Sequence, residues 1–280
     1  MYSRQNLAPE VRALTTGLAM GESPRWHEDR LWCCDWGAQE IIAVDLHGRS
    51  EVALRTSFAL PFCIDWLPDG RLLVVSGREG LVLGREPDGT LVTHADLRGL
   101  SPAVWNEIVV DGRGNVYING GPGIVLLTPD GLVREVANSF AFPNGMAVTP
   151  DNSTLIIAES HGKKITAFDI AKDGGLSRRR VWADLGDGVP DGICIDADNA
   201  VWYADVPNKR CVRVREGGAV LQTVTVDRGC FACMLGGEKR ETLFIVATEW
   251  RGMEKIPDVA RERTGKVLTI AAPASGSGWP

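Results

Sequence analysis

Short strand-like segments recur along the whole chain, and this repeat limits the possible folds more than any other feature. Each unit opens with two strand-like runs joined by a tight turn, as at residues 107–110 and 116–118, and two more runs follow, as at 123–127 and 132–136. The turns are rich in Pro, Asp, Asn and Gly, which favour hairpin conformations. Four strands in roughly 40–45 residues is typical of a propeller blade. Six units predict an all-β, six-bladed β-propeller, which explains the repeat better than a pair of β-sandwiches or a solenoid.

The ends of the chain have different roles in this prediction. A strand at residues 10–14 is expected to pair with residues 266–270, so that it completes the last four-stranded blade and removes an exposed sheet edge. Residues 1–280 would then form a single domain with a core of about 10–270. Residues 271–280 are rich in Gly, Ser and Ala and are expected to be a disordered tail.

Composition excludes several classes of partner and location. The net charge of −6 argues against nucleic acid and anionic membranes, which select basic surfaces. No apolar run approaches the ~18 residues of a membrane span. The first residues lack the apolar core of a signal peptide, so we expect a cytoplasmic protein. Because a closed propeller needs no partner to bury its core, a monomer or weak homo-oligomer is expected.

Seven cysteines lie inside apolar segments, where free buried thiols are the expected state. Cys230 and Cys233 have the spacing of a redox pair but lack the βαβ context of that motif. They are therefore interpreted as filling the interior of a blade.

The residues that precede the first strand of each unit should form a ring at one mouth of the central channel. They are Glu22, Phe62, Asn106, Asn144, Asp191 and Cys233. Polar groups facing inward are costly unless they are satisfied. The oxygens of Glu22, Asn144 and Asp191, with Asn106 nearby, suit a hard divalent cation. The same residues could instead tie strand ends by hydrogen bonding, and spacing does not decide between these interpretations.

Three segments, 21–26, 142–145 and 190–192, resemble the signature segments of the senescence-marker-protein/gluconolactonase/luciferin-regenerating-enzyme-like (regucalcin-like) family. Residues 230–237 resemble its entry into the final blade. The resemblance implies a six-bladed propeller with one divalent cation held by Glu22, Asn144 and Asp191, and hydrolysis of lactones, most often sugar lactones. It also implies that Asp191 is the general base and that Asn106 contacts substrate or metal. The ion is left open among Ca²⁺, Zn²⁺, Mn²⁺, Mg²⁺ and Fe²⁺.

The third unit departs from the family pattern. Sugar-lactone members of the family usually carry Arg-x-Asn-Asp-Gly there, whereas this chain has Val104, Trp105, Asn106, Glu107 and Ile108. The first four of these are predicted to contact substrate. Loss of the arginine, a fork of hydrogen-bond donors, indicates a less hydroxylated and more apolar lactone or ester.

The sequence therefore predicts a metal-dependent lactonase or esterase whose partner is a small molecule. Two alternatives remain open. One is a propeller that binds a metal or ligand without turnover, as a scaffold or sensor, because fold alone does not separate these functions. Alternatively, the same metal site could hydrolyse a phosphotriester.

Overall fold

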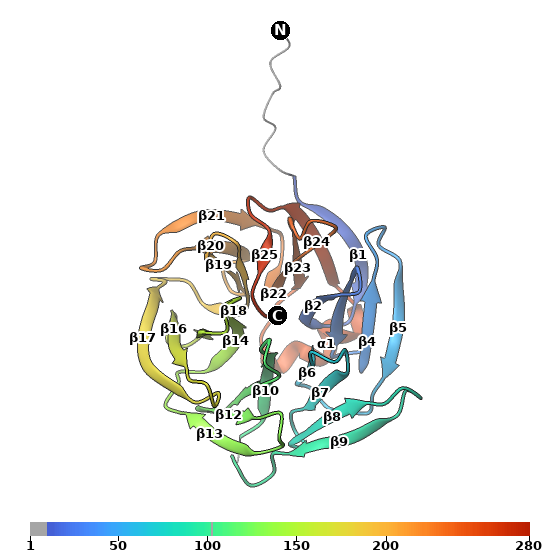
Figure 1. Ribbon diagram of the computed structural model, residues 1–280. Helices are drawn as coiled ribbons and strands as arrows, with labels where there is room; N and C mark the ends of the chain where they lie inside the picture. The colour runs from blue at the N-terminus through green and yellow to red at the C-terminus, as the bar shows by residue number, and fades with distance from the viewer. Residues whose placement is uncertain (1–9, 102) are drawn as a thin grey trace.

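The computed structural model describes residues 10–101 and 103–280, whose strands form six sheets around a central axis (Figure 1). Each blade is an antiparallel sheet whose strands follow one another in sequence, except that the last blade is completed by a strand from the start of the chain and the fifth gains a short strand from the end of the chain. The predicted all-β, six-bladed propeller is confirmed. The repeat was readable because each hairpin is built from local turn residues and short apolar strands.

The strands of the first three blades are β2 (Gly21–His27), β3 (Arg30–Asp35), β4 (Glu40–Val44) and β5 (Ser50–Arg55) in blade 1, β6 (Phe62–Trp66), β7 (Leu72–Ser76), β8 (Leu81–Arg85) and β9 (Leu91–Asp96) in blade 2, and β10 (Trp105–Val110), β11 (Val116–Gly120), β12 (Gly123–Leu127) and β13 (Val133–Ala137) in blade 3. Those of the last three are β14 (Pro143–Val148), β15 (Thr154–Glu159), β16 (Lys164–Ile170) and β17 (Leu176–Asp184) in blade 4, β18 (Pro190–Asp196), β19 (Val201–Asp205), β20 (Arg210–Val214) and β21 (Val220–Thr225) in blade 5, and β22 (Gly229–Gly236), β23 (Thr242–Thr248), β24 (Gly265–Ala271) and β1 (Arg12–Leu18) in blade 6.

Strand β1 closes the ring as the sequence predicts. It pairs antiparallel with β24, with Arg12 opposite Thr269 and Leu18 opposite Gly265. The outermost strand of the last blade therefore comes from the other end of the chain. This pairing satisfies the edge of β24 and holds the first and last blades together.

The first strands of the blades pack closely around the axis, and two glycines make this possible. A Cβ on Gly145 would lie 2.5 Å from the carbonyl oxygen of Asp191, and one on Gly192 would lie 2.4 Å from the Cβ of Ala232. Any side chain at either position would push β14, β18 and β22 apart. The glycines that follow Asn144 and Asp191 are thus required by packing.

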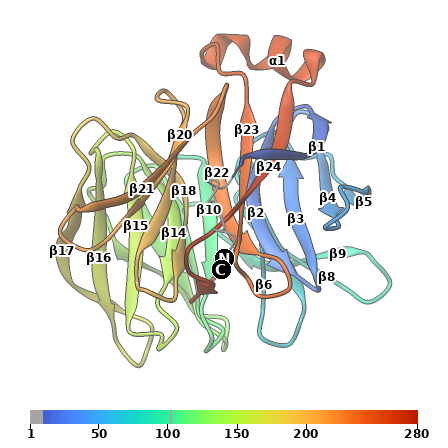
Figure 2. The same ribbon diagram turned by 90° about the horizontal axis from the view of Figure 1, so that it is seen from above.

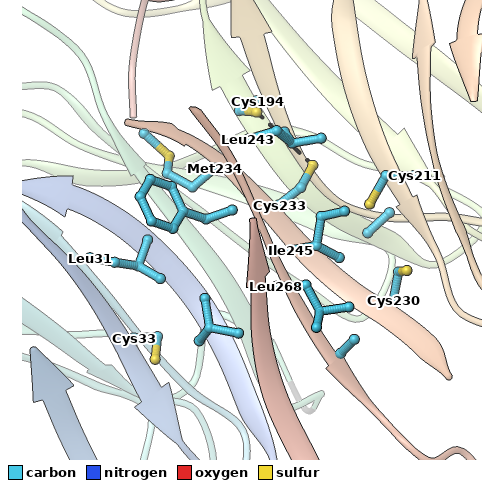
Figure 3. Close-up of a cluster of buried hydrophobic side chains, with 14 of the residues drawn as sticks. Leu31, Cys33, Cys194, Cys211, Cys230, Cys233, Met234, Leu243, Ile245 and Leu268 are labelled. Carbon is cyan, nitrogen blue, oxygen red and sulfur yellow. Dashed lines mark hydrogen bonds between the residues drawn. The ribbon is translucent and has the colours of Figure 1, made fainter. Parts of the chain in front are cut away.

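The seven cysteines are all free and buried, as expected. Five of them lie in one core cluster shared by blades 1, 5 and 6, among Leu243, Ile245 and Leu268 (Figure 3). The Sγ atoms of Cys194 and Cys233 are 4.0 Å apart. The Cys230 and Cys233 pair is therefore part of blade packing.

The structure corrects the expectation of a disordered tail. Residues Gly276–Ser277 form β25, which pairs with β18 through Ile195 and Asp196. The backbones of Trp279 and Val148 exchange two hydrogen bonds of 2.7 and 2.9 Å. The end of the chain thus lies at the centre of the ring (Figure 1), where it covers the ends of strands from neighbouring blades.

One insertion between β23 and β24 was not predicted. It forms the 3₁₀ turn η1 (Met253–Lys255) and the helix α1 (Ile256–Glu262), which stands at one end of the strands (Figure 2). Its seven residues are too few to show a helical period in the sequence. No helix in the described part of the chain is long and apolar enough to cross a membrane.

Candidate functional site

A cavity of about 670 Å³ is lined in part by Met253 and Ile256. It therefore lies at the end of the propeller where α1 stands (Figure 2). Two sets of segments line it: the connections that lead into the first strands, and the turns between the second and third strands. The first set supplies Met20, Glu22, Leu60, Pro61, Val104, Asn106, Phe142, Pro143, Asn144, Val189, Asp191 and Phe231. The second supplies Trp36, Arg78, Gly121, Ser160, His161, Val206, Pro207, Trp250, Met253 and Ile256.

Irregular strand starts aim the polar side chains into this cavity. The register of the first hairpin shifts between Glu22 and Arg25 in blade 1, and between Trp105 and Glu107 in blade 3. Blades 4 and 5 shift next to Asn144 and Asp191 in the same way. A bulge redirects a side chain that regular alternation would point elsewhere. The four predicted polar residues therefore converge on one space.

Hydrogen bonds connect the two amides to the neighbouring blade. The Asn106 Nδ2 donates to the Asn144 Oδ1 at 3.3 Å, and the Asn144 Nδ2 donates to the Ser160 Oγ at 3.4 Å. Ser160 in turn donates to the carbonyl oxygen of Pro190 at 2.7 Å. Because Pro190 precedes Asp191, this series of hydrogen bonds fixes the spacing between the Asn144 and Asp191 segments.

The two carboxylates of the cavity are electrostatically destabilised as they stand. Burial, and then the nearby Asp191 carboxylate, raise the pKa of Glu22 well above its usual range. Burial, and then Glu107, likewise raise the pKa of Asp191, although a hydrogen bond from Asn144 opposes the shift. Two acids that share a desolvated space favour protonation unless a cation compensates them.

This donor set fits a hard divalent cation. Within the described residues, no group of three or more His, Cys, Asp or Glu side chains is arranged to hold a metal. A cation would therefore need amide oxygen from Asn144 or Asn106 together with Glu22 and Asp191. Such mixed carboxylate and amide oxygen ligation is typical of Ca²⁺ and of similar hard ions.

Glu107 and Trp105, which the sequence predicts as substrate contacts, lie elsewhere. The Glu107 Oε1 accepts a hydrogen bond from the Arg25 Nη2 at 3.0 Å, and both side chains are buried. Trp105 is buried in the apolar core beside Cys63 and Ile108. The register shift beside Asn106 leaves both neighbours off the cavity wall. The buried Glu107 carboxylate is still close enough to raise the pKa of both Glu22 and Asp191.

Two of the six ring positions also differ from the prediction. Phe62 starts the one first strand that has no register shift, and it packs in the core of blades 1 and 2. In blade 6 the shift lies between Cys230 and Ala232, so Phe231 lines the cavity while Cys233 is buried. The spacing alone placed the sixth position two residues too late.

Other wall residues were missed because they come from turns between second and third strands. Arg78, His161 and the insertion residues Trp250, Met253 and Ile256 all belong to this group. The one sequence signal for these residues is that the turn between the second and third strands occupies the same place in all six repeats. Trp250, Met253 and Ile256 add apolar surface to the wall.

Comparison with known proteins agrees with this geometry. The model of the SMP-30/Gluconolactonase/LRE-like region matches residues 20–249. The chain belongs to this family. It is 26% identical over 248 residues to pentonolactonase XacC of Haloferax volcanii, covering 77% of this chain and 84% of that protein. It is 30% identical over 282 residues to regucalcin of Macaca fascicularis, covering 89% and 90% of the two chains.

Among solved structures, a luciferin-regenerating enzyme superposes with a TM-score of 0.83 at 17% identity, over 97% of this chain and 98% of that one. At this identity the likeness concerns the fold. It agrees with the six-bladed arrangement.

Proposed function

We propose that this protein is a divalent-metal-dependent hydrolase that opens a lactone or a related ester. The observation that carries the proposal is the convergence of Glu22, Asn106, Asn144 and Asp191 on one cavity from four blades. Membership in a family with a pentonolactonase and gluconolactonases supports the reaction class.

Glu22, Asn144 and Asp191 are the residues that would hold the cation. When bound, the cation would polarise the acyl oxygen and stabilise the negative charge that develops on it. Asp191 would accept a proton from the attacking water and return it to the ring oxygen as the acyl carbon–oxygen bond breaks. Asn106 would orient the substrate by donating a hydrogen bond from Nδ2.

The wall of the cavity favours a substrate with few hydroxyl groups. Val104 occupies the position where the family's sugar lactonases carry arginine, and Phe142, Phe231 and Trp250 extend the apolar surface. Sugar hydroxyls buried against such a wall would lose their hydrogen bonds to water. We therefore place an aliphatic or aromatic lactone, or a related ester, ahead of a sugar lactone.

The test is hydrolysis of a panel of sugar and aliphatic lactones with EDTA, Ca²⁺, Zn²⁺, Mn²⁺, Mg²⁺ or Fe²⁺. Asp191→Ala should lower kcat by about 10³-fold or more, because it removes a metal ligand and the base together. Asp187→Ala is the matched control, since this carboxylate is 78% exposed and lies outside the cavity wall. It should retain full activity.

Three results would contradict the proposal in different ways. If no lactone or ester is turned over with any ion, the protein is a binding propeller. If a phosphotriester is preferred over every lactone, the reaction class is wrong. If gluconolactone is the best substrate, the inference from Val104 fails while the reaction class stands.

A further inference from the structure

Packing fixes one arginine on the cavity wall. Arg78 lies in the turn between β7 and β8, directly after Gly77. A Cβ on Gly77 would lie 2.1 Å from the carbonyl oxygen of Trp105 and 2.7 Å from that of Pro61. The Gly77 N–H donates to Pro61 at 3.1 Å, and the Trp105 N–H donates to the Gly77 carbonyl at 3.2 Å. The backbone of Arg78 is therefore held beside the connection that carries Val104 and Asn106.

The guanidinium of Arg78 has no anionic partner in the described part of the chain. Its Nε donates to the carbonyl oxygen of Leu60 at 2.8 Å, which is its one hydrogen bond to a described residue. Two other arginines of this part of the chain do have an acidic partner, Arg71 with Asp69 at 3.7 Å and Arg98 with Asp96 at 2.6 Å. An arginine anchored through Nε still has both terminal nitrogens free for a planar, two-oxygen acceptor.

The charges of the cavity leave room for one negative group on the ligand. Its ionisable wall residues are Glu22, Asp191, Arg78 and His161. A divalent cation would balance the two carboxylates, so the charge of Arg78 stays uncompensated. The cavity wall also carries exposed apolar side chains, with Phe142 at 49%, Trp250 at 37% and Met253 at 67% exposure.

We propose that Arg78 is a specificity residue that binds a carboxylate of the substrate, so that the natural substrate is an acid-bearing lactone or ester with an apolar body. This inference rests on the proposed hydrolase function for the reacting end of the molecule. The carboxylate would lie against Arg78, the apolar body against Phe142, Trp250 and Met253, and the acyl group beside Asn106 and Asp191. Arginine suits this role because its fork matches both carboxylate oxygens.

The test uses two γ-lactones with the same ring and alkyl chain, one ending in a carboxylate and the other in a primary amide. In the metal-loaded wild type, kcat/KM should be higher for the acid. Arg78→Gln should lower kcat/KM for the acid by about 10- to 50-fold, mainly through KM, and leave the amide within about twofold. Arg78→Lys should recover part of the difference, because it restores the charge without the fork.

A binding measurement separates this inference from turnover. Tetrahydrofuran analogues of the two lactones lack the carbonyl, and their affinity can be followed by calorimetry with Ca²⁺ and again with EDTA. The acid analogue should bind about tenfold more weakly to Arg78→Gln than to the wild type in both conditions, which excludes coordination to the cation as the cause. Arg98→Gln is the matched control, because it removes a guanidinium from the same blade outside the cavity wall.

The outcomes are distinguishable from failure of the hydrolase proposal. Selective binding of the acid analogue without turnover of any lactone would overturn the hydrolase function and retain the carboxylate site. Equal losses for acid and amide in Arg78→Gln would mean that Arg78 only supports the turn. An equal loss for a neutral sugar lactone would assign Arg78 to hydroxyl recognition instead. Either of the last two results overturns the inference.

Discussion

The same six first strands produce two very different ends of the channel. At the end covered by α1, the strand starts present Glu22, Asn106, Asn144 and Asp191 to a cavity. At the opposite end the strands run into hairpin turns, and the buried carboxylates that begin two of these turns are fully engaged. Asp196, for example, accepts hydrogen bonds from the backbone of Asp198 and Ala200 and from the Arg213 Nε at 2.7 Å.

This difference shows which end is built for a ligand. Asp111 repeats the engaged arrangement, since it accepts from the backbones of Arg113 and Asn115 and from the Asn115 side chain. Buried polar groups in proteins are normally satisfied. At Glu22, the nearby Arg25 does not offset burial and the Asp191 and Glu107 carboxylates, so the pKa of Glu22 stays raised. A bound cation would relieve this cost, which favours this end as the ligand site.

The largest effect is expected from removing one buried carboxylate at each end. Glu22→Gln should lower turnover by at least about 100-fold, because a metal ligand is lost. The same change should raise the free energy of unfolding in EDTA by roughly 1 kcal/mol, because burial and Asp191 disfavour the ionised carboxylate. Asp196→Asn should instead lower stability by about 2–3 kcal/mol, because Arg213 loses its buried partner.

Turnover assays and urea unfolding with and without Ca²⁺ check the predictions for these two variants. The wild type and Asp196→Asn should both gain stability on adding Ca²⁺, and Glu22→Gln should not. If Glu22→Gln is less stable than wild type in EDTA, Glu22 holds the strand start together and the contrast between the two ends is lost.

A middle layer of the channel joins the two ends. Asp65 lies 3.6 Å from the Arg25 Nε and accepts the backbone N–H of Val110 at 2.8 Å. Burial raises the pKa of Asp65 from 3.8 to about 6, and Arg25 only partly offsets this. The folded protein therefore binds the Asp65 proton more tightly than the unfolded chain, and ionisation between about pH 4 and 6 costs stability.

Asp65→Asn removes this titration. Between pH 4 and pH 7 the wild type should lose up to about 3 kcal/mol of stability relative to the variant. Urea unfolding of both proteins across this range measures the difference. If the difference in unfolding free energy between the two proteins does not change with pH, Arg25 keeps Asp65 ionised throughout. This layer would then resemble the end around Asp196, where carboxylates are fully hydrogen-bonded, and not the cavity.

Local sequence predicted the blades and the metal-site candidates but not the whole cavity. Turn residues and short apolar strands act over a few positions, so the hairpins could be recognised one by one. Glu22, Asn144 and Asp191 could be recognised because Pro and Gly beside them belong to the same local segments. Their convergence in one cavity follows from the repeat, while their roles in catalysis remain predictions.

What escaped prediction depends on contacts that form only when the ring closes. Trp105 and Glu107 flank Asn106 in sequence, yet the bulge sends them to the core and to Arg25. Arg78 and Trp250 reach the cavity from blades distant in sequence. The Gly- and Ser-rich composition of residues 271–280 gives no sign of the strand edge that β25 meets on β18.

The smallest effects are expected from replacing two tryptophans of similar exposure that lie at opposite ends of the channel. Trp279 is 38% exposed, and its ring lies so close to Gly112 that a Cβ there would be 2.8 Å from Cζ2. Trp279→Ala should therefore lower stability by about 2 kcal/mol and leave kcat/KM unchanged, because it loosens the segment that covers blades 3 to 5.

Trp250, at 37% exposure, lines the cavity. Trp250→Ala should do the reverse, raising KM for apolar lactones about threefold with little change in unfolding. Thermal unfolding and kinetics of both variants decide the point, since matching losses of stability would mean that both ends are structural.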